Sequence, residues 1–368
     1  MSMTPSKPDF SAASAILREG IAARAFPGAS FSVVANGGII ASEGIGRLTY
    51  EAESPSVSGA TIYDLASVTK VVATTTMAML LYERGQLDLD LPLAAVLPEF
   101  AGLDRRRSQV TLKMLLAHSS GLPAYERLYE KAKSPEAMIS AAAHVGMVAE
   151  PNSRVEYSDV GFILLGEALR RIADEDLDAF CAREIFGPLS LAATAFNPPQ
   201  EWRAHVPPTE DDRNFRHRVI QGEVHDENAS VMAGVAGHAG LFSTVGDLGC
   251  FGQCMLKGGE PILRRETIEL FTKAVGLAPQ HALGWDLPTP PSQAGSLLSS
   301  RSFGHLGFTG TSLWVDPENR VAITLLTNRT WPDTGNQAIR TLRPRIHDAI
   351  VGALEREPLP PRELARSV

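Results

Sequence analysis

Cysteine is scarce in this 368-residue chain, which contains only Cys181, Cys250 and Cys254. An odd number of cysteines without regular spacing excludes a disulfide framework and fits reduced thiols. Cys250 and Cys254 would lie one helical turn apart, but a zinc motif needs a second pair of ligands nearby, and the sequence has none there. We therefore expect no metal at the cysteines.

The chain also lacks long apolar runs and an excess of positive charge. No segment is long enough to span a membrane, and the first twenty residues contain no apolar stretch of the signal-peptide type. We expect a cytoplasmic protein, or a periplasmic one if a leader is missing. A formal net charge of -8 argues against the concentrated basic surface that a nucleic-acid partner needs.

What is present is an ordinary globular composition, with 44% hydrophobic and 21% charged residues. These proportions exclude a disordered chain. A chain of 368 residues exceeds the usual size of one domain, so we expect one large domain or two associated lobes.

Apolar spacing and turn residues predict the order of the elements. Helical spacing extends over 10–24, 66–84 and 335–355, and the stretch 86–240 is mainly helical, broken by Pro and Gly loops. Strands are predicted in the segments FSVVANGGIIASEGIG, LGWDL, SFGHLGF, TSLWVD and RVAITLLTN. Strands near both termini therefore flank a helical block.

This order indicates an α/β (α+β) fold with an antiparallel sheet, flanked by helices, and an inserted helical lobe. Residues 1–85 and 242–368 would form the sheet lobe, and 86–241 the helical lobe. A cleft between two lobes is a common place for a site. The junction near residue 66 would lie in that cleft.

In the stretch SVTK, Lys70 follows Ser67 by three residues near the start of a predicted helix. This spacing puts both side chains on one helical face, where a lysine can activate a serine hydroxyl as a nucleophile. The first-turn N–H groups, which lack intrahelical partners, can stabilise negative charge near Ser67. With 28 serines and 7 lysines, about 0.5 such pairs arise by chance, so the pair alone proves little.

Two further stretches extend the pair to a constellation. VEYSDVGFILLG places Tyr157 before Asp159, and the tyrosine could relay a proton with Lys70. SFGHLGFTGTS places His305 and Gly307 on a predicted strand, whose exposed edge could offer backbone N–H groups to an oxyanion.

In this order of motifs, SxxK, Tyr-x-Asp and His-x-Gly, the chain resembles the serine β-lactamase and penicillin-binding-protein superfamily. It is most similar to the class C β-lactamase branch, which includes D,D-carboxypeptidases, D-aminopeptidases and esterases. The segments GEVHDENA, GVAGHAGLFS and GHLGFTGTSLWVDP look closest to penicillin-binding proteins of the 4B type. The resemblance covers nearly the whole chain and implies the β-lactamase/transpeptidase-like fold.

The resemblance implies a role for each matching residue. Ser67 would be the acylated nucleophile, and Lys70 and Tyr157 would share general-base and general-acid duty. The backbone N–H groups of Ser67 and Phe308 would form the oxyanion hole, where each donor can contribute on the order of 3 kcal/mol. Gly307 would keep the strand edge open to the substrate.

Two residues depart from the usual pattern of that superfamily. Asp159 stands where asparagine is commonest, and an ionised carboxylate cannot donate a hydrogen bond. We expect it either to contact the substrate or to hydrogen-bond the loop that carries Tyr157. His305 stands where lysine is common, and a histidine is largely neutral at pH 7. The site should therefore hold anionic substrates less firmly, which favours neutral esters or amides.

Other polar residues are assigned to scaffolding. His118 in AHSSGLP is expected to fix a loop. The cluster of His225, Asp226, Asn228 and His238 lacks the tight spacing of a metal motif and is expected to form the pocket wall or a loop scaffold. No cofactor and no metal is expected.

The leading hypothesis is a serine hydrolase that forms an acyl-enzyme on Ser67, of the β-lactamase-like or D,D-carboxypeptidase type. Its substrate would be a β-lactam, a D-Ala-D-Ala-like peptide or an ester. The first alternative is a carboxylesterase of β-lactamase fold that acts on short-chain esters. The second is a non-catalytic module that senses penicillin or a peptide, against which the intact Ser67, Lys70 and Tyr157 argue.

Overall fold

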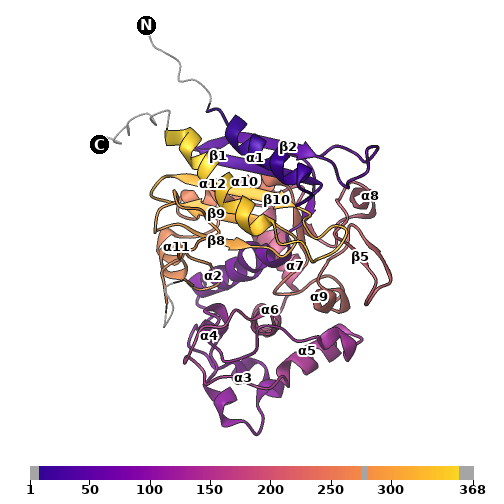
Figure 1. Ribbon diagram of the computed structural model, residues 1–368. Coiled ribbons are helices and arrows are strands. Elements are labelled where there is room, and N and C mark those ends of the chain that lie inside the picture. Colours follow the sequence, from indigo (N-terminus) through magenta and orange to yellow (C-terminus); the bar gives the residue numbers. More distant parts are fainter. Residues whose placement is uncertain (1–7, 276–279, 356–368) are drawn as a thin grey trace, which may run out of the picture.

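A five-stranded antiparallel sheet with the strand order β2-β1-β10-β9-β8 forms the centre of the computed structural model, which describes residues 8–275 and 280–355 (Figure 1). Strand β1 pairs with β10, so the two ends of the chain share one sheet, and this prediction is confirmed. The strands are β1 (Gly28–Ala35), β2 (Gly38–Gly46), β8 (Phe303–Leu306), β9 (Ser312–Asp316) and β10 (Val321–Thr327).

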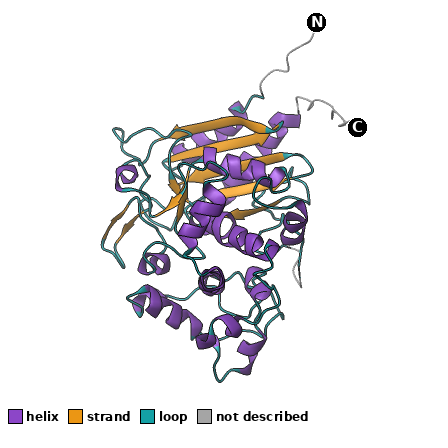
Figure 2. Cartoon of the chain, turned by 180° about the vertical axis from the view of Figure 1, so that it is seen from behind, coloured by secondary structure: helices purple, strands orange, loops and turns teal. Residues whose placement is uncertain are grey.

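Helices cover both faces of this sheet and form most of the region beside it. Helices α1 and α12 cover one face and α10 the other, while α3 to α6 lie away from the sheet (Figures 1 and 2). No α-helix of the described chain is long and apolar enough to cross a membrane. The α-helices are α1 (Ser11–Ala22), α2 (Thr76–Glu83), α3 (Leu93–Val96), α4 (Leu112–Leu116), α5 (Pro135–Ala143), α6 (Asp159–Ala173), α7 (Leu177–Cys181), α8 (Gln200–Arg203), α9 (Glu227–Val231), α10 (Val245–Leu256), α11 (Arg265–Phe271) and α12 (Ile339–Glu355).

Strand β1 is buried along its whole length because both faces of the sheet are covered. Side chains alternate between the two faces of a strand. Phe31 and Val33 therefore belong to the apolar core that α1 and α12 complete. On the opposite face, Ser32 Oγ donates a hydrogen bond of 2.6 Å to the Val245 carbonyl at the start of α10.

Shorter strands lie outside the main sheet. Strands β3 (Tyr63–Asp64) and β4 (Ala195–Phe196) flank β7 (Leu241–Ser243), and β5 (Glu210–Asp212) pairs with β6 (Arg218–Ile220). The stretch predicted to be mainly helical thus also contains β4, β5 and β6, which are too short to give an alternating pattern. The division into lobes at residues 85/86 and 241/242 stays a prediction.

The segment predicted as an α-helix over 66–84 is helical but not uniformly α-helical. It begins with a 3₁₀ turn at Ala66–Val68, continues as a π-helix at Lys70–Thr75 and ends as α2. The hydroxyl of Thr76 donates to the Val71 carbonyl at 2.8 Å, which satisfies one carbonyl of the widened stretch. Wide turns of this kind are frequent at functional sites.

Two predictions near the C-terminus are corrected. Helix α12 begins at Ile339 rather than at 335, because Arg329 Nη1 donates to the Thr334 carbonyl and so holds the preceding residues in a loop. The predicted strand LGWDL forms only isolated bridges, in which Asp286 pairs with Gly304 of β8 and with His281. Gly284, with a φ of 85°, turns the chain away from the extended conformation just before that bridge.

His347, fully buried on α12, makes the stability of the fold depend on pH. Burial lowers its pKa to about 4, and the positive charge of Arg343 acts in the same direction, while a hydrogen bond to the Ala294 carbonyl opposes them. Between about pH 6.5 and pH 4 the unfolded chain binds a proton that the folded chain excludes, so stability falls as the pH drops through this window.

Between about pH 7 and about pH 4.5, we expect the free energy of unfolding to fall by about 2–3 kcal/mol more in the native protein than in His347→Gln, because glutamine binds no proton. Urea unfolding of both proteins at both pH values measures the difference. His205→Gln, at an exposed position, is the matched control and should leave the pH dependence unchanged. An equal decrease in the free energy of unfolding between the two pH values, in the native protein and in His347→Gln, would contradict this explanation.

Candidate active site

Ser67 follows a strained backbone position between β3 and the helical segment that ends in α2. The preceding residue, Ala66, has a φ of 47°, a left-handed conformation that non-glycine residues rarely adopt. The buried Asp64 carboxylate holds this turn, because it accepts from the Ala66 N–H at 2.8 Å and from the His225 N–H at 2.7 Å. Strain of this kind persists where contacts enforce it, and it clusters at active sites.

Lys70 is fully buried, and its Nζ makes three polar contacts. It donates to Ser67 Oγ at 3.0 Å, to the Asp159 carboxylate at 2.6 Å and to the His238 carbonyl at 3.1 Å. The spacing of Ser67 and Lys70 thus brings the two side chains into hydrogen-bonding contact. A buried ammonium needs a counter-charge, and Asp159 supplies it.

Asp159 is the first residue of α6, directly after the N-cap Ser158, whose Oγ accepts from the Gly161 N–H at 2.9 Å. The sequence left two alternatives for its side chain, a substrate contact or a bond to the Tyr157 loop. Its carboxylate forms the ion pair with Lys70, and a substrate contact stays a prediction. The signal that could have predicted this contact is the motif lysine itself, since a lysine in a predicted apolar helix requires an anion.

Tyr157 lies beside the lysine, with Lys70 Nζ 4.8 Å from its ring centre. Burial raises the pKa of Tyr157 well above its usual value, as does the charge of Asp159, while a hydrogen bond with Ser67 opposes them. The phenol therefore keeps its proton at neutral pH. The ring of His118 packs 4.6 Å from that of Tyr157, and its Nδ1 accepts from the backbone of the same loop at 3.0 Å.

His305 is almost fully buried at the end of β8. Its Nδ1 donates to the Leu306 carbonyl at 2.8 Å, and its Nε2 has no hydrogen-bond partner within the described structure. Burial lowers the pKa of His305, and the charge of Lys70 acts in the same direction, while Asp286 opposes them. The imidazole is therefore neutral at pH 7, as the sequence predicts.

Gly307 allows β8 to approach the segment that carries the nucleophile candidate. A Cβ at this position would overlap Thr311 Oγ1 and the Leu65 carbonyl oxygen, so a side chain would displace the protein itself and not only obstruct the substrate. Thr311 Oγ1 donates to that carbonyl at 2.9 Å, and Thr309 Oγ1 donates to the Asp64 carbonyl at 2.8 Å. The sheet edge is thereby tied to the residues just before the serine.

The backbone N–H groups of Ser67 and Phe308 donate no hydrogen bond to any other described residue. The Phe308 carbonyl accepts from Arg329 Nε at 2.7 Å, which fixes the chain just after the strand edge. Ser67 and Phe308 also line the same two cavities. Two free donors beside a serine hydroxyl are what an oxyanion hole requires.

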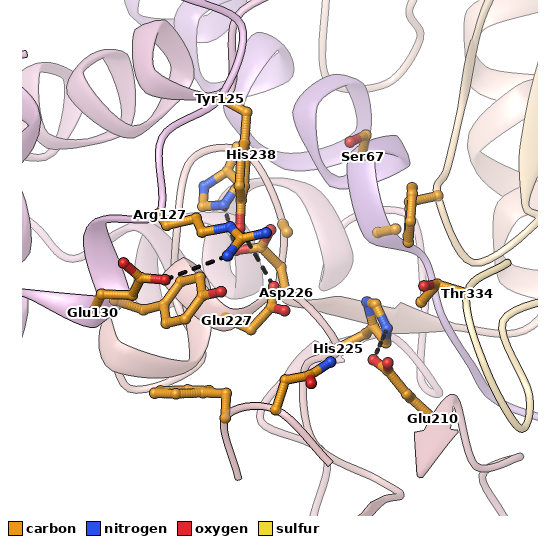
Figure 3. Close-up of a pocket in the computed structure, with 16 residues that line it drawn as sticks. Ser67, Tyr125, Arg127, Glu130, Glu210, His225, Asp226, Glu227, His238 and Thr334 are labelled. Atoms are coloured by element: carbon orange, nitrogen blue, oxygen red, sulfur yellow. Dashed lines mark hydrogen bonds and ion pairs between the residues drawn. The ribbon is translucent and has the colours of Figure 1, made fainter. Parts of the chain in front are cut away.

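The two cavities that meet at Ser67 and Phe308 differ in charge. The acidic cavity, of about 630 Å³, is drawn in Figure 3, and its carboxylates are Glu130, Glu210, Asp226 and Glu227. The arginine cavity, of about 420 Å³, also contains Tyr157 and His305, and its cationic side chains, Arg329, Arg340 and Arg343, outnumber its one carboxylate, that of Asp286. The serine therefore lies between an acidic and a basic cavity.

The three arginines of this cavity were not predicted from the sequence to be site residues. Arg340 and Arg343 lie three residues apart on α12, and neither forms an ion pair with a described residue. Two cationic residues without ion-pair partners on one face of an amphipathic helix were the signal that could have identified them.

The histidine and aspartate cluster forms separate pairs. His225 Nε2 lies 2.8 Å from Glu210, and His238 Nε2 lies 2.7 Å from Asp226 (Figure 3). Within the described parts of the chain, no group of three or more His, Cys, Asp or Glu side chains is arranged to hold a metal ion. Both histidines line the acidic cavity.

Comparison with known proteins gives extensive matches. Residues 13–345 match the Beta-lactamase family. The "N-acetylmuramyl-L-alanine amidase" of Bacillus subtilis strain 168 is 33% identical over 344 residues, which cover 83% of this chain and 78% of that protein. The "Putative D-alanyl-D-alanine carboxypeptidase" of Escherichia coli strain K12 is 34% identical over 304 residues, which cover 73% and 69%.

The fold also has solved counterparts. The structure of a penicillin-binding-protein homologue from Caulobacter crescentus superimposes with a TM-score of 0.76 at 20% identity, covering 95% of this chain and 99% of that one. This likeness confirms the predicted β-lactamase/transpeptidase-like fold. Together with the match over 13–345, it means that the chain belongs to the β-lactamase family and is a hydrolase of the serine β-lactamase fold.

Proposed function

We propose that this hydrolase forms an acyl-enzyme on Ser67 and cleaves the amide bond of a peptide that ends in a carboxylate, a D,D-carboxypeptidase type of reaction. The observation that carries the proposal is the 3.0 Å contact between Lys70 Nζ and Ser67 Oγ beside two free N–H donors. The names of two relatives, a carboxypeptidase and an amidase, both denote amide hydrolysis and support it.

In the acylation step, Lys70 first passes one proton to the Asp159 carboxylate 2.6 Å away and so becomes a neutral amine. Ser67 Oγ then attacks the carbonyl carbon and forms the new C–O bond, while its proton passes to Lys70 Nζ. The N–H groups of Ser67 and Phe308 bind the negative charge that develops on the carbonyl oxygen. The pair of Lys70 and Tyr157 delivers one proton to the leaving nitrogen as the C–N bond breaks. Tyr157 suits this delivery because its raised pKa keeps it protonated.

In the deacylation step, water attacks the ester carbonyl of the acyl-enzyme. One proton of that water restores the Ser67 hydroxyl through Lys70 and Tyr157, and the acid product leaves. The sum of the two steps is the addition of one water molecule across the amide bond.

The arginine cavity supports a leaving group with a carboxylate. Burial lowers the pKa of Arg343 to about 9, which still leaves it charged at neutral pH, and its Nε has no partner in the described structure. Arg340 is exposed at the same cavity. A carboxylate bound in this cavity would give the exposed Arg340 a charge-assisted hydrogen bond. These cations offset the loss of positive charge that the neutral His305 brings to the site.

The second candidate is a carboxylesterase on short-chain esters, which the neutral state of His305 favours. Cytoplasmic residence, expected from the sequence, would restrict a carboxypeptidase to small peptide fragments. Both candidates use the same acyl-enzyme. They differ in the charge of the substrate, which ends in a carboxylate for the carboxypeptidase and is a neutral ester for the carboxylesterase.

We expect Ser67→Ala to lower hydrolysis of both peptide and ester by at least about 1,000-fold, because the nucleophile is lost. Release of D-alanine from Nα,Nε-diacetyl-Lys-D-Ala-D-Ala and of p-nitrophenol from p-nitrophenyl butyrate measures this, and an unchanged Tm verifies the fold. Ser108→Ala, at an exposed position, is the control. Full activity in Ser67→Ala would refute the nucleophile assignment.

We expect Arg340→Gln to lower kcat/KM for a peptide with a free C-terminal carboxylate by about tenfold relative to the same peptide as a C-terminal amide, about 1.4 kcal/mol. Arg345→Gln is the matched control on α12, since Arg345 pairs with Glu19 outside the cavity. A ratio that Arg340→Gln leaves unchanged would speak against the carboxylate and for a neutral substrate.

A further inference from the structure

Arg329 is a buried cation without a counter-charge. The residue is 4% exposed, and it forms no ion pair with any residue that the structure describes. Burial lowers its pKa to about 10, and the charge of Arg340 acts in the same direction, so the guanidinium stays charged at neutral pH. A buried charge without a counter-ion destabilises a fold unless hydrogen bonds satisfy it. The hydrogen bonds of this guanidinium therefore indicate its role.

Within the described structure, the guanidinium donates to backbone carbonyls of two different segments. Nε donates to the Phe308 carbonyl at 2.7 Å, and Nη1 donates to the carbonyls of Thr334 and Asn336 at 2.9 Å each. Phe308 follows β8, whereas Thr334 and Asn336 precede α12. Arg329 therefore ties the residue just after the strand edge to the loop before α12.

The same guanidinium lies over the Phe308 ring, with Arg329 Cζ 4.3 Å from the ring centre. The face of an aromatic ring attracts a cation at this distance. On the side of the acidic cavity, which Figure 3 shows, the His225 ring lies 5.6 Å from the Phe308 ring. Because Phe308 is 51% exposed, contacts with these two neighbours hold its ring, and burial in the apolar core does not.

The two peptide units that flank Phe308 are held by different partners. The Gly307 carbonyl, which belongs to the same peptide unit as the Phe308 N–H, accepts from the Gly310 N–H at 3.0 Å. The C=O and N–H of a trans peptide unit point in opposite directions, so this turn directs the Phe308 N–H away from Gly310. The second peptide unit is held through the Phe308 carbonyl, to which Arg329 donates.

Arg329 also contacts the two residues that follow Phe308. Its backbone N–H donates to the Thr309 carbonyl at 3.0 Å. Its side chain passes so close to Gly310 that a Cβ there would lie 2.7 Å from Arg329 Cγ. Gly310 has a φ of 98°, which a residue with a side chain rarely adopts. One arginine thus contacts three successive residues of the turn after β8.

We propose that Arg329 is a positioning residue, which orients Phe308 so that its backbone N–H serves as a donor of the oxyanion hole. This inference rests on the proposed function, which assigns that N–H to the oxyanion hole. Arg329 acts through the carbonyl and the ring of Phe308 and not on the reacting atoms. Its role therefore differs from that of Arg340, whose exposed guanidinium is assigned to the substrate carboxylate.

A neutral ester separates this role from carboxylate binding, because its binding does not depend on the charge of the cavity. We expect Arg329→Gln to lower kcat and kcat/KM for p-nitrophenyl butyrate equally, by about 100-fold, the effect of misplacing a catalytic group by about 1 Å. Arg329→Lys keeps a cation near the ring and should recover about tenfold of that loss.

Arg24→Gln is the matched control, because Arg24 is exposed, lies outside both cavities and has its Cζ 4.0 Å from the centre of the Tyr50 ring. It should leave hydrolysis of the ester unchanged. A higher KM with unchanged kcat in Arg329→Gln, or an equal loss of kcat in Arg24→Gln, would overturn the inference.

Infrared spectra of the acyl-enzyme give a readout that general damage to the fold would not give. A hydrogen bond to the ester carbonyl weakens its C=O bond and lowers the stretching wavenumber. With an isotopically labelled acyl carbonyl, we expect this band at a higher wavenumber in Arg329→Gln than in the native protein. Phe308→Leu leaves the bonds of Arg329 to Thr334 and Asn336 in place and should shift the band in the same direction, so the test does not depend on the folding of one variant.

The outcomes separate this inference from the proposed function. An acyl-enzyme whose carbonyl band is the same in the native protein, Arg329→Gln and Phe308→Leu would overturn the positioning role alone. Absence of an acyl-enzyme on Ser67 in the native protein would refute the proposed function, and the positioning role with it.

Discussion

The burial of the Lys70 ammonium is the constraint around which the site is arranged. A charged amine with no exposed surface is tolerable only if it is paired and hydrogen-bonded, and its three partners come from the turn at Ser67, the start of α6 and the chain at His238. These segments lie far apart in the sequence. One side chain therefore fixes the relative positions of the serine, the Tyr157 loop and the wall of the acidic cavity.

A second set of contacts ties this centre to the sheet. The hydroxyls of Thr309 and Thr311 donate to the carbonyls of Asp64 and Leu65, just before Ser67, and Gly307 lets the strand come close enough for them to do so. The strained Ala66 and the free N–H group of Ser67 lie directly after these two carbonyls in the chain. The sheet is thus tied to the turn that carries Ser67, and the proposed oxyanion hole depends on this connection.

Much of this could be predicted from the sequence, because the motifs are local. The pair Ser67 and Lys70 follows from helical spacing, and the shared sheet follows from strands at both ends of the chain. The ion pair of Lys70 with Asp159 could not be derived from spacing, since its partners are 89 residues apart. The two cavities could not be predicted either, because Glu227 and Arg340 come from α9 and α12. Only the folded chain brings both to cavities that Ser67 also lines.

The acyl-enzyme on Ser67 is tested most directly by intact-protein mass spectrometry after exposure to a labelled penicillin and rapid acid quenching, followed by peptide mapping. We expect a mass increase of one penicilloyl group in the native protein, located on the peptide that contains Ser67, and none in Ser67→Ala. Undiminished labelling of Ser67→Ala, or an adduct mapped to a different residue, would contradict the assignment of this serine as the nucleophile.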